Sequence, residues 1–231
     1  MMIFGGDPSE VPFVMFDIQH LIIIGIFFGG LVFIYFSRKH NVSRKVEIGA
    51  GLSLVMFEVA HHFWLLYHGR WEIDYALPLH LSSISVILII ILLFTRSRWL
   101  FEIAFLVGIG GAVQAVMTPV LVYGWPHFRF IHFFYTHVGV IWVVFYFLWH
   151  KKFPLRAWSI VKAMVFLNVL LPLIWLVNLR TGGNYWFIME KPSGASLLDV
   201  LGPHPWYILG MEAAALVLFT LLWAVFGRKR T

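Results

Sequence analysis

Seven long apolar segments, separated by short connections, constrain the fold of this chain more than any other feature of its sequence. Each has close to the ~20 residues that an α-helix needs to cross the hydrocarbon core of a bilayer. They cover residues 16–37, 46–67, 77–95, 99–121, 130–150, 157–179 and 205–226. A membrane core admits only helices and closed barrels, and these segments lack the apolar–polar alternation of barrel strands. The sequence therefore predicts an all-α membrane protein, with residues 1–231 forming a single domain of seven transmembrane helices.

The composition excludes the main classes of soluble protein. Of 231 residues, 61% are hydrophobic and only 12% are charged, which is far from the balance of a soluble domain. The net charge of +6 does not indicate a nucleic-acid partner, because the basic residues gather in short clusters between apolar segments. The chain has no cysteine, which excludes disulfides and thiolate chemistry. These observations leave the oligomeric state open.

The Lys and Arg residues predict the orientation in the membrane. Thirteen of the 17 lie in one set of connections: Arg38, Lys39, Arg44, Lys45, Arg96, Arg98, Lys151, Lys152, Arg156, Lys162, Arg228, Lys229 and Arg230. The other set carries Arg70, Arg129, Arg180 and Lys191, and the two sets alternate along the chain. Because basic loops stay in the cytoplasm, we expect a multi-pass protein of the cell membrane with its N-terminus outside and its C-terminus in the cytoplasm.

The longest connection joins the sixth and seventh segments, at residues 180–204. It is rich in glycine and proline, which interrupt helices and favour turns. We expect it to form a structured outer loop.

Polar side chains in and beside the apolar segments gather at one depth, in the outer half of the membrane. They are Asp17, His20, Glu58, His61, His62, His80, Gln114, Thr118, Arg129, His132, His137, Asn178, Asp199, His204 and Glu212. An ionisable side chain at the centre of a membrane helix costs on the order of 2.5–3.5 kcal/mol by insertion scales, so such groups face one another or water. The sequence predicts an outward-facing polar cavity. For Glu47, Glu102 and Lys162, near the cytoplasmic face, we expect side chains that extend to the aqueous boundary.

The spacing of Glu58, His61 and His62 places all three on one helix face, where a carboxylate can orient an imidazole. A Glu-x-x-His pair is also a ligand pattern of di-iron bundles, and Asp17-x-x-His20 is an approximate second copy. The cluster is therefore either an inward hydrogen-bonded network without a cofactor or a site for zinc or iron.

Acyl chemistry is another use of this layer, since it needs a nucleophile, a base and a donor that stabilises an anion. Ser82 is a candidate nucleophile, His80 or His137 a candidate base, and Arg129 a candidate clamp for phosphate or carboxylate. Spacing alone favours a packing or hydrogen-bonding role for serines in membrane helices.

Five segments carry a more specific pattern: LPLHLSSIS (77–85), GIGGAVQAVMTP (108–119), WPHFRFIHFFYTHVG (125–139), GGNYWFIMEKP (182–192) and SLLDVLGPHPWY (196–207). In order and spacing they resemble the signature segments of the YwaF-like bacterial integral membrane proteins. That family is similar to the eukaryotic transmembrane protein 164, regarded as a phospholipid acyltransferase that uses a cysteine and a histidine. The resemblance implies a shared membrane fold and an activity on lipid.

The resemblance points to His80, Gln114, His127, Arg129, His137, Asn184, Tyr185, Lys191 and Asp199. One departure concerns the mechanism. Bacterial relatives often have cysteine two places after the histidine of the third segment, where this chain has Ser82. A serine attacks an ester only when a base activates it, so the cysteine mechanism does not transfer directly.

We therefore expect a His-rich outer pocket that binds the headgroup or acyl ester of a membrane lipid, for acyl transfer or hydrolysis. His137 or His80 would act as the base, Ser82 as the nucleophile, and Glu58 would orient His61 or His62. The expected substrate-binding residues are Arg129, His127, Asn184, Tyr185, Lys191, Gln114, Asp199, His61, His62 and His132.

Two rival functions remain at this stage. Prolines in the spans and titratable groups near one face also suit a small-solute or proton-coupled transporter. A carrier needs access from both sides, and the cytoplasmic half contains few polar residues, which favours a one-sided pocket. The third hypothesis is a metal-dependent membrane enzyme.

Overall fold

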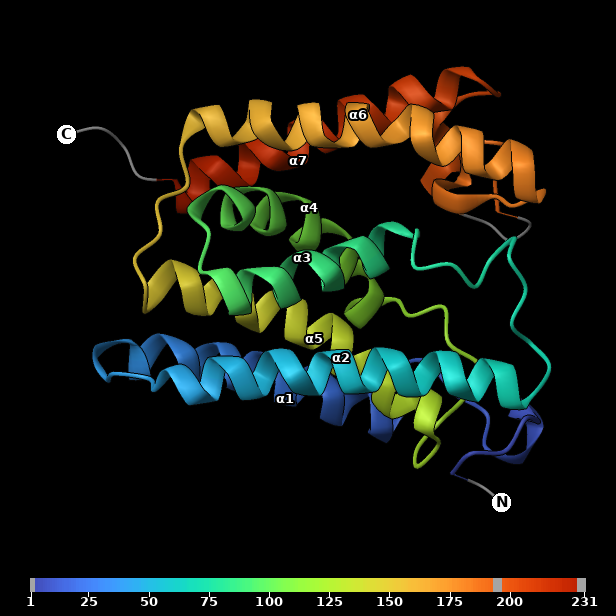
Figure 1. Cartoon of the computed structure of the whole chain (residues 1–231), viewed down its shortest axis with the longest axis horizontal. Helices are drawn as coiled ribbons and strands as arrows, with labels where there is room; N and C mark the ends of the chain where they lie inside the picture. The colour runs from blue at the N-terminus through green and yellow to red at the C-terminus, as the bar shows by residue number, and fades with distance from the viewer. Residues whose placement is uncertain (1–2, 193–196, 228–231) are drawn as a thin grey trace.

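The computed structural model describes residues 3–192 and 197–227. Its seven α-helices lie side by side (Figure 1): α1 Ile18–Phe36, α2 Arg44–Tyr67, α3 Leu81–Thr95, α4 Arg98–Met117, α5 Phe128–Trp149, α6 Ala157–Thr181 and α7 Trp206–Phe226. Four short 3-10 helices accompany them: η1 Pro8–Glu10, η2 Ser37–Lys39, η3 Tyr185–Phe187 and η4 Leu197–Leu201. Six of the α-helices are long and apolar enough to cross a membrane, and α3 is a shorter apolar helix. The predicted all-α fold with seven helices is confirmed.

Polar side chains at the helix starts explain several residues that the sequence placed in the polar layer or the loops. Asp17 Oδ1 accepts a hydrogen bond from His20 N at 3.0 Å, and Ser97 Oγ accepts one from Leu100 N at 3.4 Å. Such caps satisfy backbone N–H groups that the first turn of a helix leaves unpaired. Asp17 is therefore the N-cap of α1.

Helix α4 is the most enclosed of the long helices and packs against α3, α5, α6 and α7. Its glycines make this packing close. A Cβ on Gly108 would lie 2.8 Å from Val140 Cγ1, and one on Gly110 would lie 2.6 Å from Leu218 Cδ2. Small residues of this kind let membrane helices approach one another.

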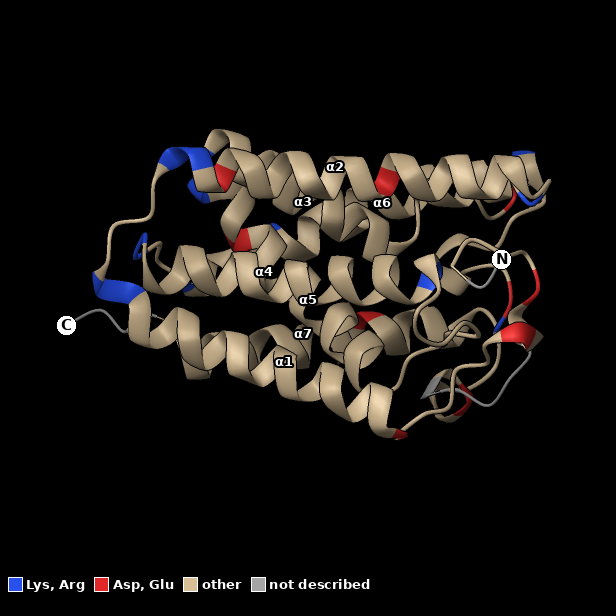
Figure 2. Ribbon diagram, turned by 90° about the horizontal axis from the view of Figure 1, so that it is seen from below, with Lys and Arg blue, Asp and Glu red and all other residues tan. Residues whose placement is uncertain are grey.

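The ends of the bundle differ in charge. Lys and Arg gather at the end of the bundle where α2 begins, whereas few lie at the end where α2 finishes (Figure 2). The predicted basic connections within residues 38–162 thus share one end of the molecule, while Arg228, Lys229 and Arg230 lie outside the described residues. In the predicted orientation this end is the cytoplasmic one.

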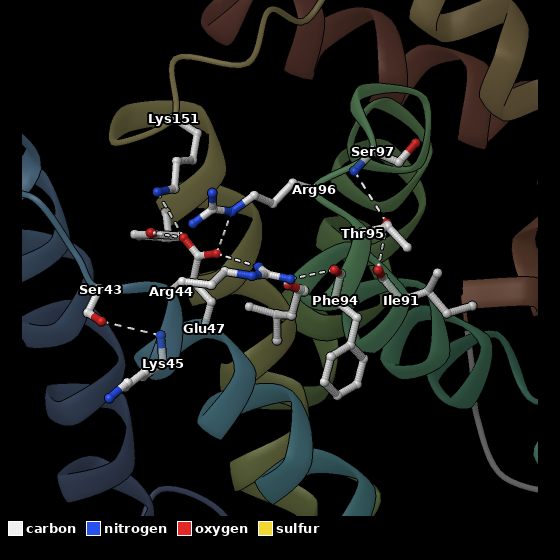
Figure 3. A network of polar contacts seen from close by, with 12 residues as sticks. Ser43, Arg44, Lys45, Glu47, Ile91, Phe94, Thr95, Arg96, Ser97 and Lys151 are labelled. Atoms are coloured by element: carbon white, nitrogen blue, oxygen red, sulfur yellow. Dashed lines mark hydrogen bonds and ion pairs between the residues drawn. The ribbon is translucent and has the colours of Figure 1, made fainter.

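Glu47 does not extend to the aqueous boundary, so that prediction is wrong. Its side chain is 1% exposed and accepts from Arg44 Nη1 at 2.6 Å, Arg96 Nε at 2.6 Å and Lys151 Nζ at 2.9 Å (Figure 3). Tyr146 OH donates at 2.5 Å to Oε1, the oxygen that Lys151 also contacts, whereas both arginines contact Oε2. These cations reach the carboxylate from the ends of three helices, so Glu47 stays buried by pairing.

Glu102 corrects the same prediction, whereas its partner Lys162 is partly exposed. Glu102 is buried, and its Oε2 accepts from Lys162 Nζ at 2.6 Å and from Ser159 Oγ at 2.8 Å. This ion pair ties α4 to α6. A carboxylate that pairs with a cation on a neighbouring helix does not need to extend to water.

The third and sixth predicted spans change at their outer ends. Helix α3 begins at Leu81, not at residue 77, and α6 continues to Thr181. The outer loop contains η3 and η4, as expected of a structured connection, while residues 193–196 lie outside the described part of the chain. Residues 71–80 therefore form an irregular connection between α2 and α3.

Candidate functional site

A cavity of about 210 Å³ lies in the half of the bundle away from the basic end, which is the outer half in the predicted orientation, between α2, the 71–80 segment, α3 and α5. Its polar lining consists of Glu58, His61, His62, Tyr75, His80, Ser83 and Arg129. Leu65, Ala76, Leu77 and Pro78 complete the wall. The structure therefore brings together polar residues from separate helices at the predicted depth.

Arg129 lies at the centre of the polar residues. Its Nη1 donates to His61 Nε2 and lies 3.4 Å from His132 Nδ1. A guanidinium has no acceptor, so both imidazole nitrogens present lone pairs to it. Arg129 thus sits in the cavity wall as a cation held by two histidines.

Glu58 is joined to this cluster through His132. The His132 Nε2 atom lies 2.9 Å from Glu58 Oε1, and the carboxylate accepts while the imidazole donates. Since His132 also faces Arg129 with Nδ1, it is the neutral tautomer that carries its proton on Nε2. The chain Glu58–His132–Arg129–His61 links α2 to α5, and Glu58 orients His132 directly, not His61 or His62 as expected.

His62 and His137 flank this chain. His62 Nδ1 accepts from Trp71 Nε1 at 3.2 Å, which fixes its ring against the 71–80 segment. His137 Nδ1 donates to Phe133 O at 2.7 Å, so its Nε2 carries the lone pair that a base needs. His137 is not part of the cavity lining. Of the two candidate bases, only His80 is in the wall.

The serines of α3 are distributed differently from the expectation. Ser83 lines the cavity together with His80, whereas Ser82 does not. Ser85 Oγ donates to Leu81 O at 2.8 Å and is buried. The spacing of three residues between His80 and Ser83 was visible in the sequence, but the resemblance pointed to position 82.

Tyr185 holds the 71–80 segment, part of which lines the cavity. Its hydroxyl donates to Ile73 O at 2.8 Å and accepts from Leu77 N at 3.0 Å. Its ring centroid lies 4.9 Å from that of His80. Burial raises the pKa of Tyr185, so the hydroxyl keeps the proton that it donates. Tyr185 is fully buried and positions the wall.

Two asparagines hold Tyr185 and its loop. Asn178 Oδ1 accepts from Tyr185 N at 2.8 Å, and Asn178 Nδ2 donates to Tyr185 O at 3.0 Å. Asn184 Oδ1 accepts from Met189 N at 3.1 Å, and its Nδ2 donates to Glu190 O at 2.9 Å. Asn184 was expected to bind substrate, and in this structure its amide bonds to its own loop.

His127 lies apart from the cavity lining and anchors the N-terminal segment. Its Nδ1 accepts from Arg129 N at 3.0 Å, and its Nε2 donates to Gly5 O at 2.9 Å. Burial lowers the pKa of His127, an effect partly offset by the bond to Gly5, so the neutral ring can cap α5. Tyr123 stacks on the ring at 4.1 Å between centroids.

The remaining predicted residues also lie outside the lining. Lys191 Nζ is 4.0 Å from Asp199 Oδ1, and Lys191 lies over the Tyr207 ring. Gln114 is exposed near the end of α4. These three residues are not brought to the cavity.

A metal ion would find three ligands of suitable chemistry here. One ligand atom each from Glu58, His61 and His132 lies within 4.8 Å of the others, and three protein ligands suffice for a catalytic zinc. Arg129 is bound to the two histidines, however, and its cation opposes a second one. The donor types fit a metal, but the guanidinium must first leave.

The second predicted Glu-x-x-His-like pair does not extend this set. His20 Nε2 donates to Val116 O at 2.8 Å, and its Nδ1 accepts from Phe16 N at 3.0 Å. His20 is fully buried, and Asp17 caps α1. The two residues tie α1 to α4, so they do not form the second half of a di-iron site.

Sequence reasoning missed Tyr75 and Trp71, which belong to the connection between α2 and α3. Tyr75 lines the cavity, and Trp71 holds His62. Only their place in the sequence could have indicated them, because they follow the polar residues of α2 within a few positions. Helix periodicity does not apply to such a segment.

Comparisons with known proteins gave one match. The model of the TMEM164 family matches residues 15–223. No curated protein matches the chain, and no solved structure does. The matched range includes every residue of the cavity lining.

Proposed function

Because the chain belongs to the TMEM164 family, we propose that it is a cell-membrane protein that binds a membrane lipid at the outer cavity and transfers or hydrolyses its acyl ester. The observation that carries this proposal is the joint placement of Arg129, His80 and Ser83 in one wall. They offer an anion-binding group, a base and a hydroxyl.

Arg129 is the group that would bind an anionic headgroup or a developing oxyanion. Its Nη1 is engaged by histidines, while guanidinium has five N–H donors in all. Histidines that accept from it keep it in place without neutralising its charge. An arginine positioned in this way can bind a phosphate or carboxylate in two-point geometry.

The chemistry follows the usual course of acyl transfer. A serine hydroxyl attacks the ester carbonyl while His80 takes its proton, and Arg129 stabilises the oxyanion. The carbon–oxygen bond to the lysolipid then breaks, and the imidazolium returns the proton to the leaving oxygen. A second hydroxyl, from an acceptor lipid or water, removes the acyl group from the serine. Ser82 is the position that the resemblance indicates, and Ser83 is the one in the wall.

Turnover of labelled phospholipid by purified protein in vesicles tests this proposal. We expect Arg129→Gln and His80→Ala to lose at least about 100-fold in rate, the usual effect of removing an oxyanion donor or base. Separate Ser82→Ala and Ser83→Ala variants identify the nucleophile. Ser85→Ala is the matched control, since Ser85 bonds only to its own helix among the described contacts. Full turnover in a variant lacking both Ser82 and Ser83 would overturn a serine mechanism.

Transport is the rival proposal. A carrier must open to both sides, and toward the basic end the buried carboxylates Glu47 and Glu102 are each held in ion pairs. Uptake of a solute by proteoliposomes without lipid turnover would favour transport instead.

A further inference from the structure

An apolar groove lies beside the polar cavity, on the other face of α5. Helices α1 and α2 both pack against α5, but they make little or no contact with each other. The space between them, with α5 as its floor, is a groove of about 450 Å³. It opens where the apolar surfaces of α1 and α2 face the bilayer.

The lining of the groove is almost purely hydrocarbon. Ile23 and Ile26 form the α1 side, Ala50 and Leu54 the α2 side, and α5 contributes residues from Phe130 to Val143. Gly139 contributes to the depth of the groove, because it has no side chain to fill the floor. Water in such a space would have almost no hydrogen-bond partners.

The dimensions of the groove select its occupant. From Phe130 to Val143 the α5 floor rises about 20 Å, at 1.5 Å per residue. The groove therefore runs along α5 with an almost purely apolar lining and opens toward the bilayer, which suits one extended hydrocarbon chain of a lipid.

The groove begins at the depth of the polar cluster. Phe130 and Ile131 line one end of the groove, and along α5 they lie between Arg129 and His132 of the polar cluster. On α2, Leu54 of the groove lies one turn from Glu58 of the cavity. A chain in the groove would thus place its polar end near the level at which Glu58 meets His132.

We propose that the groove between α1, α2 and α5 holds one acyl chain of an outer-leaflet phospholipid and presents its ester at the depth of the polar cavity. This inference rests on the proposed function and names its substrate class, a lipid with an acyl chain in the bilayer. Phe57 of α2 and Tyr135 of α5 stack with ring centroids 4.4 Å apart, and Tyr135 lines the groove.

Photo-crosslinking tests the groove without any turnover. Vesicles would contain a phosphatidylcholine with a diazirine in its sn-2 chain, and labelled peptides would be mapped by mass spectrometry. We expect labelling at the α5 floor and the facing residues of α2. Gly139→Leu should lower this labelling by about tenfold or more, because the new side chain replaces the apolar surface that the lipid chain buries.

Gly29→Leu is the matched control, because Gly29 is exposed on α1, outside the groove, with no atom within 4 Å of an added Cβ. It should leave labelling unchanged. Ala50→Phe fills the groove from α2 and repeats the test if Gly139→Leu does not fold. The proposal would be overturned by labelling that is spread evenly over all lipid-facing helices and does not decrease in Gly139→Leu or Ala50→Phe.

The result separates the two proposals. Labelling of the groove in a wild-type protein that turns over no lipid would contradict the proposed function and support the binding of an acyl chain in the groove. Lipid turnover with no groove labelling would have the opposite meaning. Loss of turnover with retained labelling in Arg129→Gln supports both.

Discussion

Two glutamates on the same helix, Glu47 and Glu58, lie three turns apart in α2 and have opposite surroundings. Glu47 accepts from three cations and a tyrosine at the basic end. Glu58 accepts from one histidine and lines a cavity. The first carboxylate is saturated by fixed partners, whereas the second has acceptor capacity left for a ligand. A carboxylate inside a membrane protein therefore indicates a binding site only when its partners leave some of its hydrogen-bond acceptor capacity unused.

Matched glutamine substitutions at Glu47 and Glu58 test this difference, and we expect them to give the largest effect. Glu47→Gln leaves Arg44, Arg96 and Lys151 close together without a counter-charge, which should lower the free energy of unfolding by about 3 kcal/mol or more. Glu58→Gln keeps an acceptor for His132 and should cost about 1 kcal/mol or less. Unfolding in mixed detergent micelles measures both. Equal losses would contradict the distinction between the two ends.

The second buried pair at the basic end sharpens the comparison. Lys162→Met leaves Glu102 with Ser159 and no cation, and we expect a loss of about 1–3 kcal/mol because Lys162 is itself partly exposed. The same unfolding measurement applies. Lys45→Met serves as a control, since Lys45 is exposed in the same basic region. A loss as large as that of Glu47→Gln would show that the number of paired cations does not matter.

Zinc binding tests whether Arg129 takes the place of a metal at the outer end. Arg129→Ala frees His61 Nε2 and His132 Nδ1, and with Glu58 these form a three-ligand set. We expect its zinc affinity to exceed that of the wild type by about tenfold, or 1.4 kcal/mol, measured by equilibrium dialysis and elemental analysis.

Adding His61→Ala to Arg129→Ala should abolish the gain in zinc affinity. Stoichiometric zinc in the wild-type protein would show that the guanidinium does not block the site. It would also favour the metal-dependent enzyme over the serine mechanism.

The smallest expected effect concerns the N-terminal segment, which His127 holds at the outer end. Because burial lowers the pKa of His127 below its ordinary value of 6.5, the neutral ring is favoured by folding. Its contribution is complete above that value and is lost as the pH falls through the lower pKa of the folded state. Protonation of Nδ1 removes the cap of α5, at a cost of about 1 kcal/mol.

Amide exchange of residues 3–13, compared with His127→Asn at each pH, measures this loss. Asparagine caps the helix but does not titrate, so the acid-induced increase should occur only in the wild type. His68, Arg129 and Glu10 also act on His127, and a His68→Asn control separates the titration of the neighbouring imidazole. The same increase in His127→Asn would assign the effect to another group.

The sequence predicted the bundle well because hydropathy reports directly on the solvent. The prediction was weaker in the irregular segments and at the helix ends. The third helix was expected from residue 77, but Tyr185 holds residues 73–77 in an irregular segment. Asp17 and His20 matched a ligand spacing, yet they cap and tie α1, since spacing does not distinguish a ligand from a cap.

The candidate site divides in the same way. Periodicity placed Glu58, His61 and His62 on one face, and they do share the cavity. It could not place the loop residues Asn184 and Tyr185, whose polar atoms bond to the backbone instead. Periodicity also placed Ser83, and not Ser82, on the helix face of His80, but the resemblance pointed to Ser82, which does not line the cavity.

The amino-acid sequence by itself determined that this chain is a helical membrane protein, which end of its bundle is basic, and the depth at which polar groups collect. Each follows from local rules, since hydrocarbon tolerates only helices and excludes unpaired charge. Only the tertiary structure decided that Glu47 is satisfied and that Glu58, His132, Arg129 and His61 form one chain beside a cavity. Those contacts join residues far apart along the chain, and the packing of helices alone sets which side chains meet.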